Sequence, residues 1–312
     1  METALVTGGA GFIGSYVVDS LILRGLNVVV IDNLSTGQKE NLLHKDVVFI
    51  EDEITNKETI NHLFELHKPK YIFHLAAQIS VSKSVREPLF DAEANITGTL
   101  NLLEAAKKYK AEKFIFSSTG GAMYGDKPEA IPTRESSPEK PAAPYGISKL
   151  ADERYLDFYY REYGLNYTIL RYANVYGPRQ NPYGEAGVVA IFTEKMIKNE
   201  PVTINGDGKY IRDYVYVEDV ANANMLAMDN GKESIYNIST GKGTDVVELF
   251  QLAERINHYN LEAQYGPERP GDLRKSILDA TKAEEELNWK PHFSLDQGLI
   301  QTHDYFASKL GL

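Results

Sequence analysis

The stretch TGGAGFIG, residues Thr7 to Gly14, decides how the first part of this chain folds. It follows directly on the short apolar run Ala4 to Val6. Gly8 permits a tight turn from a strand into a helix, Gly11 lets the backbone approach a pyrophosphate, and Gly14 lets the helix pack closely on the sheet. The stretch therefore predicts a dinucleotide-binding loop, although a tight turn that binds nothing would also suit these glycines.

The sequence around this loop supports the first interpretation. The apolar periodic segment Phe12 to Leu23 predicts a helix whose first amides point at an anion, and a second strand is expected at Val28 to Ile31. Asp32 ends that strand about 20 residues beyond the glycines, where a carboxylate accepts hydrogen bonds from an adenosine ribose. No arginine lies between Ile31 and Asn41 to bind a ribose phosphate, so the pattern favours NAD. Alternatively, Asp32 and Asn33 only open the turn DNLSTG.

The composition excludes several classes of function. A chain of 312 residues is long enough for one large or two modest domains. A net charge of -11, without a basic stripe, argues against a nucleic-acid partner. The absence of cysteine excludes disulfides and thiolate metal sites, and we expect no metal. Met1 stands almost directly before the first strand and no apolar run approaches the ~18 residues that span a bilayer, so we expect a cytoplasmic protein without a membrane segment.

Short apolar runs suited to strands alternate with stretches long enough for helices. The runs are Ala4 to Val6, Val28 to Ile31, Val47 to Ile50, Tyr71 to His74, Phe114 to Ser117 and Tyr167 to Leu170. This alternation predicts an α/β fold with a doubly wound parallel sheet of the Rossmann type. The proline-rich segment Asp126 to Pro144 predicts an ordered surface loop.

The rhythm of the sequence changes near Tyr172. Beyond it come Gly/Pro-rich turns, a short strand expected at Val215 to Val217 and a helix expected at Val247 to Ile256. We therefore expect a cofactor domain over residues 1–171 and, over residues 172–312, a smaller α/β lobe that binds the substrate. The chain is expected to cross back to the first domain within this second part.

A tyrosine and a lysine stand one helical turn apart at Tyr145 and Lys149, just after Pro144, where a helix is expected to begin. The spacing alone is weak evidence, because it recurs at Tyr109/Lys113 and Tyr305/Lys309. Tyr145 differs from those tyrosines because it follows the fifth strand, whose end carries hydroxyl side chains. In open α/β sheets, ligands bind beyond such strand ends.

These residues have the chemistry of a general base. Lowering the pKa of a phenol from about 10 to about 7 requires roughly 4 kcal/mol of stabilisation of its anion. Lys149 and an oxidised nicotinamide ring supply positive charge for this purpose, and Thr119 would orient or relay the proton of a substrate hydroxyl. Alternatively, Tyr145 and Lys149 have no catalytic role and are only a tyrosine at a helix start and a solvated lysine.

Motifs along almost the whole chain resemble those of the extended short-chain dehydrogenase/reductase family, and within it the UDP-galactose (UDP-glucose) 4-epimerases. In chain order the motifs are TGGAGFIG, VVIDNLSTG, FHLAAQ, NITGTLNLLEAA, FIFSST, PYGISK, LRYANVYGPR, IRDYVYVEDVA and RPGD. The resemblance implies that NAD is contacted by Gly8, Gly11, Phe12, Ile13, Gly14, Asp32, Asn33, Ser35, Thr36, Gly37, Glu53, Ile54, Leu75, Ala76, Ala77, Gln78, Asn95, Ser117, Tyr145, Lys149 and Tyr172. It implies that a UDP-sugar is contacted by Thr119, Tyr145, Asn174, Val188, Thr203, Arg212, Arg269, Asp272 and Ser276.

The activity that the resemblance implies is reversible epimerisation at carbon 4 of a UDP-hexose. Tyr145 would remove the hydroxyl proton while hydride passes to tightly bound NAD, and the ketone would then turn in its pocket before hydride returns to its other face. Thr119 and Lys149 complete the catalytic set. Arg212 and Arg269 suit a diphosphate, because each offers a planar fork of donors.

Two stretches depart from the pattern of the family. The chain reads SSTGGAMYG where the epimerases usually read SSS or SSA before the VYG turn, so the placement of Thr119 differs by an apparent extra residue. The segment that usually carries an adenine-contacting aspartate reads Glu51, Asp52, Glu53 and Ile54 here. We assign the adenine contact to Glu53.

Three other functions are open at this point. A nucleotide-sugar 4,6-dehydratase or decarboxylase would need an acid and a base directly after Thr119, where this chain has Gly120 and Gly121. A UDP-glucuronate 4-epimerase would need a cation or amide for the sugar carboxylate. A nucleotide-binding regulatory protein could share the fold without the chemistry, although the retention of Tyr145 and Lys149 argues against it.

Two further expectations concern the partner and the sugar. The helix expected at Lys149 to Tyr163 carries more large apolar groups than one buried stripe needs, so we expect a homodimer in which the segment Thr99 to Tyr109 completes a four-helix bundle, as in the family. In the family, the position four residues beyond the RPGD aspartate faces the 2-substituent of the hexose. The small Ser276 occupies it here and leaves room for an N-acetyl group, unless Arg274 or Lys275 fills the space.

Overall fold

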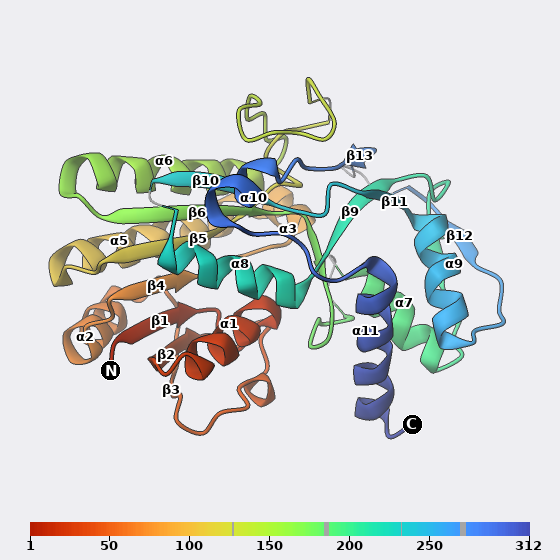
Figure 1. The fold of residues 1–312 in the computed structure, drawn as a ribbon, viewed down its shortest axis with the longest axis horizontal. Coiled ribbons are helices and arrows are strands. Elements are labelled where there is room, and N and C mark those ends of the chain that lie inside the picture. Colours follow the sequence, from red (N-terminus) through yellow and green to blue (C-terminus); the bar gives the residue numbers. More distant parts are fainter. Residues whose placement is uncertain (127, 184–186, 232, 269–272) are drawn as a thin grey trace.

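A seven-stranded parallel sheet forms the larger part of the molecule (Figure 1). The computed structural model describes residues 1–126, 128–183, 187–231, 233–268 and 273–312. In spatial order the strands are β10 (Ser234–Ile238), β6 (Asn166–Tyr172), β5 (Lys113–Thr119), β4 (Tyr71–His74), β1 (Thr3–Thr7), β2 (Asn27–Asp32) and β3 (Val48–Glu51). All neighbouring pairs are parallel, which confirms the doubly wound Rossmann-type sheet.

Helices cover both faces of this sheet, because its strands are apolar on both sides. Successive residues of β1 point to opposite faces: Ala4 and Val6 join one core, and Leu5 joins the other. The first core contains side chains of α1 (Phe12–Leu23), α8 (Val217–Asp229) and α10 (Thr281–Leu287). The second contains side chains of α2 (Lys57–His67), α5 (Gly98–Tyr109) and α6 (Pro144–Tyr163).

Short helices follow two of the strands. They are η1 (Lys39–Asn41) after β2 and, after β4, α3 (Val81–Arg86), α4 (Pro88–Ala92) and the π-helical turn η2 (Glu93–Thr97), which runs into α5. Because β1 pairs with β2 on one side and with β4 on the other, the strand order reverses at β1. Ligands of open α/β sheets bind beyond the carboxyl ends of the strands at such a point.

The second lobe lies beside the carboxyl ends of these strands (Figure 1). One small sheet holds β11 (Gly243–Asp245), β9 (Ile211–Tyr216), β13 (Lys275–Ser276) and β7 (Asn174–Tyr176), and another holds β12 (Gln264–Gly266) and β8 (Thr203–Asn205). Three helices pack around them: α7 (Val188–Ile197), α9 (Val246–Asn257) and α11 (Leu295–Leu310). The short strand expected at 215–217 begins four residues earlier, and Val217 already opens α8.

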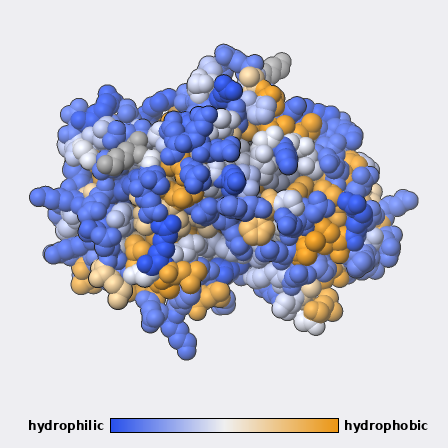
Figure 2. Space-filling view, viewed as in Figure 1, coloured by the Kyte–Doolittle hydropathy of each residue, from blue (hydrophilic) through white to orange (hydrophobic). Residues whose placement is uncertain are grey.

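Residues after 172 contribute to both parts of the molecule. β10 adds the outermost strand to the large sheet, and α8 packs against α1 in the first core. The described residues of the proline-rich loop are tied to the second lobe, since the Thr133 amide donates to Ile277 O at 2.9 Å. No helix in the described parts of the chain is both long and apolar enough to span a membrane. The face shown in Figure 2 is mostly hydrophilic, with apolar side chains in smaller separate patches.

Candidate active site

The glycine-rich loop connects β1 to α1 at the point where the strand order reverses. Gly8 has a φ of 69°, and a Cβ there would lie 2.7 Å from Ala76 N. A Cβ on Gly14 would lie 2.1 Å from Gly8 O, so any side chain would push α1 away from the loop. Gly11 caps α1 without a side-chain hydrogen bond, which leaves the first amides of the helix for a ligand. Phe12 and Ile13 form that first turn. The loop therefore has the shape and the donors that a pyrophosphate requires.

Asp32 joins this loop to the end of β2. Its carboxylate accepts from Ala10 N at 3.0 Å and from Leu34 N at 2.9 Å. Burial raises the pKa of Asp32, and the backbone donors oppose that rise. Asn33 accepts from Ser35 N at 3.0 Å, so the two side chains do open the DNLSTG turn. A carboxylate offers about four acceptor positions, so Asp32 also has capacity for ribose hydroxyls.

The rest of this turn packs against the glycine-rich loop. A Cβ on Gly37 would lie 2.9 Å from Ala10 C and 3.0 Å from Asp32 Oδ1, and the Gln38 amide donates to Ala10 O at 2.9 Å. Ser35 and Thr36 precede Gly37 on this turn. The structure thus brings this turn and the glycine-rich loop together.

The segment after β3 contains two carboxylates, Asp52 and Glu53, with different partners. Asp52 is engaged by the start of α2, accepting from Asn56 Nδ2 at 2.9 Å and from Thr59 Oγ1 at 2.5 Å. Glu53 is exposed and meets only the Thr55 hydroxyl, at 3.1 Å, among the described residues. Ile54 is buried against α5. Of the two carboxylates, Glu53 is therefore the one left for a ligand.

The segment after β4, Leu75 to Gln78, is held from two sides. Thr7 Oγ1 accepts from the amides of Leu75 at 3.2 Å and Ala76 at 3.1 Å. From the other side, Asn95 accepts from Gln78 N at 2.8 Å and donates to Gln78 O at 3.1 Å. Asn95 is buried, so its amide positions the segment that also contains Ala77.

Thr119, Tyr145 and Lys149 come together beyond the carboxyl end of β5. Thr119 is the last residue of β5, and Tyr145 lies in the first turn of α6, four residues before Lys149. Burial raises the pKa of Tyr145 to about 12, the nearby Thr119 hydroxyl lowers it, and the Asp91 carboxylate raises it. Lys149 is buried and donates to Ser117 O at 2.9 Å. Burial lowers the pKa of Lys149 against the pull of neighbouring carboxylates.

Ser117 and Tyr172 meet across the paired strands β5 and β6. Their hydroxyl oxygens are 2.9 Å apart, and Asn224 Nδ2 donates to the Tyr172 oxygen at 2.9 Å. Burial raises the pKa of Tyr172 to about 12, and the hydrogen bonds of Ser117 and Asn224 lower it. Both hydroxyls therefore belong to a neutral buried network beside Lys149.

Several buried charged residues around this site were missed by the sequence reasoning. Asp91 accepts from Ser148 Oγ at 2.6 Å and from Gln78 Nε2 at 2.8 Å. Arg171 forms an ion pair with Glu153, whose other contact is the Ser118 hydroxyl at 2.6 Å. Arg171 lies within the motif LRYANVYGPR, but no motif indicates these pairings, because the partners are distant in sequence. Only Glu153 carries a local signal, one helical turn beyond Lys149.

The residues expected to bind the sugar are divided among three elements of the second lobe. Arg212 on β9 pairs in register with Ser276 on β13, and Asn174 on β7 pairs with Tyr214 on the same β9. The structure thus brings Arg212, Ser276 and Asn174 onto one small sheet. Val188 begins α7, and Thr203 lies exposed on the separate β8–β12 sheet. Arg269 and Asp272 lie outside the described residues.

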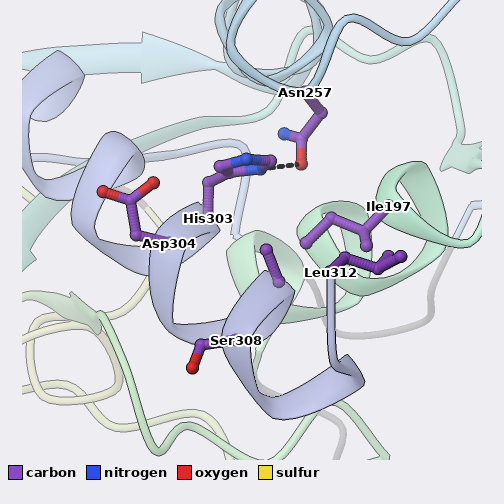
Figure 3. Close-up of a pocket in the computed structure, with 7 residues that line it drawn as sticks. Ile197, Asn257, His303, Asp304, Ser308 and Leu312 are labelled. Carbon is purple, nitrogen blue, oxygen red and sulfur yellow. Dashed lines mark hydrogen bonds between the residues drawn. The ribbon is translucent and has the colours of Figure 1, made fainter.

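A surface pocket of about 450 Å³ contains none of these residues (Figure 3). It lies between α7, α9 and α11, and His303 Nδ1 and Asn257 Oδ1 meet across it at 2.9 Å. Ile197 and Leu312 form much of its apolar wall. Its lining residues belong to α7, α9, α11 and the C-terminus, so it is not part of the site around Thr119 and Tyr145.

Comparison with known proteins agrees with this geometry. Residues 4–239 match the family described as "NAD dependent epimerase/dehydratase family". A crystal structure of a UDP-glucose 4-epimerase with UDP-glucose from Thermotoga maritima superposes with a TM-score of 0.97 at 57% identity, covering 99% of both chains. The Thermus thermophilus UDP-glucose 4-epimerase in complex with NAD gives a TM-score of 0.93 at 46% identity, covering 97% of this chain and 98% of that one.

A relative from another organism is similar over almost its whole length. The UDP-glucose 4-epimerase of Mycolicibacterium smegmatis is 44% identical over 310 residues, which cover 98% of each protein. The family model, this relative and the two solved structures agree with one another on the family of the chain. This chain belongs to the NAD-dependent epimerase/dehydratase family, in the branch of the UDP-glucose 4-epimerases.

Proposed function

We propose that this protein interconverts UDP-glucose and UDP-galactose by epimerisation at carbon 4, with NAD as a tightly held cofactor. The observation that carries the proposal is the position of Tyr145: partly exposed, beside the Thr119 hydroxyl and one helical turn before the buried Lys149. This trio lies beyond the end of β5, and the glycine-rich loop lies beyond the end of β1 in the same sheet. Such an activity would serve galactose metabolism, and we place it in the cytoplasm, as the sequence predicts.

The cofactor site is built from residues that fit NAD. The loop has no room for a side chain at Gly8 or Gly14, and the first amides of α1 are without a side-chain cap. Asp32 has acceptor capacity for the ribose, and the exposed Glu53 is available near the adenine end. Bound NAD would supply a hydride acceptor and donor for carbon 4 of the sugar, held by the glycine-rich loop, Asp32 and Glu53.

Two side chains of the protein act on the hydroxyl group at carbon 4 of the sugar. The Tyr145 phenolate takes the proton of this hydroxyl, and the Thr119 hydroxyl hydrogen-bonds the substrate oxygen and orients it. Burial, as the largest influence, raises the pKa of Tyr145 to about 12 in spite of the Thr119 hydroxyl, so its ionisation near neutral pH requires added positive charge. The Lys149 ammonium and the oxidised nicotinamide supply that charge together.

The second lobe holds the UDP-sugar in this proposal. Arg212 binds the diphosphate as a planar donor group, and Asn174 lies on the same small sheet. Arg269 and Asp272 complete the set that we assign to the nucleotide sugar, with Val188 and Thr203 at its edge. The ketone formed at carbon 4 turns within this pocket while the nucleotide stays anchored.

Ser276 extends the proposal to N-acetylated sugars. Ser276 is half-buried and pairs in register with Arg212, which we assign to the substrate site. Its side chain is small. Of the two neighbours that could fill the space, Arg274 and Lys275, the first is held elsewhere. Arg274 makes two hydrogen bonds to Asp207, at 2.8 and 2.7 Å, and its guanidinium lies 4.8 Å from the Tyr210 ring centroid. We therefore propose that UDP-GlcNAc and UDP-GalNAc are substrates as well.

We also propose a homodimer. Large apolar side chains remain exposed on three helices that pack together: α3, α4 and α6. They are Val81, Val85, Leu89, Phe90, Ile147, Tyr155, Phe158 and Tyr163. The helix expected to share this face, α5, contributes none of the large exposed apolar side chains, because it buries its apolar stripe in the second core. The partner face that we propose is therefore built by α6 with α3 and α4.

Dehydratase or decarboxylase chemistry is less well supported by the residues after Thr119. A Cβ on Gly120 would lie 2.2 Å from Leu278 Cδ1, so no acidic or basic side chain fits there without repacking. Gly121 has open space but no side chain to transfer a proton.

The proposed function is tested by adding UDP-galactose to the NAD-loaded protein and identifying the products. We expect UDP-glucose at equilibrium with no net change in NAD, and a small transient absorbance of reduced nicotinamide. A dehydrated or decarboxylated sugar would replace the proposal with one of its alternatives. Bound NAD without any change in the sugar would indicate a regulatory nucleotide-binding protein.

A further inference from the structure

The turn that follows β7 contains an arginine in a backbone conformation that favours glycine. Gly177 to Gln180 form this turn, in which the Gln180 amide donates to Gly177 O at 3.4 Å. Arg179 is the third residue of the turn and has a φ of 67°. A positive φ at this position usually requires glycine or asparagine, so an arginine here costs free energy and needs contacts that hold it.

The Arg179 side chain reaches from the second lobe to helix α1 of the cofactor domain. Its Nη2 lies 2.8 Å from Asp19 Oδ2, and its guanidinium lies 4.4 Å from the centroid of the Tyr16 ring. Tyr16 and Asp19 are three residues apart on α1 and therefore share one face of the helix. Arg179 thus holds this face by an ion pair and a cation–π contact together.

The ion pair is shielded from water. The side chains of Arg179 and Asp19 are 12% and 19% exposed. A second pair on the same helix, Arg24 with Asp229 of α8, has the same distance of 2.8 Å, but its side chains are 35% and 46% exposed. Exposed pairs contribute little, because water and salt screen them, whereas a shielded pair is screened less. The Arg179 pair is therefore the stronger of these two links to α1.

The helix that Arg179 holds begins at the glycine-rich loop. Phe12 and Ile13 form its first turn, whose amides we assign to the pyrophosphate of NAD. Together with Tyr16, these two side chains pack against the apolar cluster of the second lobe that contains Tyr176. The second lobe therefore supports the N-terminal part of α1, and Arg179 adds a charged contact to this apolar packing.

The same turn is also fixed to the strand on the sugar side. Gln180 Nε2 donates to Val175 O at 3.1 Å, and Val175 follows Asn174 on β7. Asn174 is one of the residues that we assign to the UDP-sugar. Contacts that run from Asp19 through Arg179 and its turn to β7 therefore link the helix at the NAD loop with a strand of the proposed sugar site.

We propose that Arg179 is a positioning residue for the cofactor: it clamps α1 to the turn after β7 and so holds the N-terminal end of that helix against the second lobe. Its effect on NAD is indirect, through α1. The inference rests on the assignment of the glycine-rich loop to NAD and does not depend on the chemistry at the sugar. Without the clamp, one of the contacts that hold α1 is lost, and the cofactor should be released faster.

The test measures how fast NADH, the reduced cofactor, leaves the protein. NADH-loaded protein is mixed with excess NAD, and the change in the fluorescence of bound NADH gives the release rate without any sugar. Arg179→Asn removes the clamp but keeps the turn, because asparagine adopts a positive φ more readily than arginine. Asp19→Asn removes the charge of the other partner at nearly constant shape, and it tests the same contact if Arg179→Asn does not fold.

We expect release to be about tenfold faster in each of these two variants. Tenfold corresponds to roughly 1.4 kcal/mol, near the lower end of the value of one hydrogen bond to a charged group. The double variant should release NADH no faster than the faster single variant, because both changes remove the same contact. Arg24→Asn is the matched control, since it breaks the exposed pair on the same helix and should change release by less than about twofold.

Two kinds of result would overturn the clamp. One is release within about twofold of the parent in both single variants, even if their thermal stability falls, because Arg179 would then only stabilise the fold. The other is a fully additive double variant, or equally fast release from Arg24→Asn. The loss would then reflect a general weakening of α1 and not the contact between Arg179 and Asp19.

Adding UDP-glucose to the NAD-loaded proteins separates this proposal from the epimerisation. A parent that converts the sugar, with variants that hold NADH as the parent does, would contradict the clamp alone. A parent that does not convert the sugar, with variants that release NADH faster as expected, would contradict the epimerisation and support the clamp.

Discussion

The Arg171 guanidinium and the Glu153 carboxylate form a two-point ion pair in the interior of the protein, with Nε–Oε1 at 2.9 Å and Nη2–Oε2 at 2.5 Å. Both side chains are fully buried. Through Glu153 the pair also anchors Ser118, the residue before Thr119, at 2.6 Å. This ion pair therefore joins β5, β6 and α6 directly behind the hydroxyls that we propose to be catalytic.

Breaking this pair should destabilise the protein strongly. In Arg171→Met, Glu153 keeps a buried charge without its cation, so we expect a loss of about 3–5 kcal/mol in the free energy of unfolding. Chemical denaturation measures the loss. Arg161→Met removes an exposed pair with Asp157 on the same helix and should cost less than about 1 kcal/mol. Equal losses in the two variants would show that burial does not set the strength of the Arg171 pair.

Replacing the proposed base should remove turnover but leave the cofactor bound. In Tyr145→Phe we expect a decrease in kcat of at least about 10²-fold, because the group that we propose as the base is removed. Retained NAD is checked by its absorbance after gel filtration. The control, Tyr109→Phe, changes a tyrosine with the same spacing to a lysine that packs on Phe64, and should leave kcat unchanged. Turnover of Tyr145→Phe within threefold of the parent contradicts the assignment.

The proposed dimer is tested by charging its apolar face. Leu89 is 86% exposed on α4 and Phe158 is 41% exposed on α6, so Leu89→Glu combined with Phe158→Glu should produce monomers at micromolar concentration. Sedimentation velocity measures the mass. Leu66→Glu is the control, because Leu66 is 64% exposed on α2, away from this face. A monomeric parent would remove the proposal altogether.

The sugar range depends on the volume beside Ser276. We expect the parent to act on UDP-GlcNAc, and we expect Ser276→Tyr to lower kcat/KM for UDP-GlcNAc by about 10- to 200-fold through crowding while sparing UDP-glucose. Steady-state kinetics with the two sugar pairs measures the ratio. A parent that rejects N-acetylated sugars by more than about 10³ contradicts the role of Ser276, because one crowded contact does not explain such selectivity.

Patterns within short stretches of sequence were sufficient to predict most of the fold and part of the site. The glycine-rich loop, the alternation of strands and helices, and the spacing of Tyr145 and Lys149 depend on backbone geometry over one turn or one strand. The structure confirms the parallel sheet, and it places Thr119, Tyr145 and Lys149 near one another at the end of β5. Family membership followed from the order of several such motifs.

Only the tertiary structure decided which distant residues meet. The strand β10 joins the large sheet from the second half of the chain, and large exposed apolar side chains gather on α3, α4 and α6. The pairing of Arg171 with Glu153 depends on which donors the folded chain brings near that carboxylate. A buried charge is defined by its neighbours in space, and most of those neighbours lie outside the few residues over which helical or strand periodicity acts.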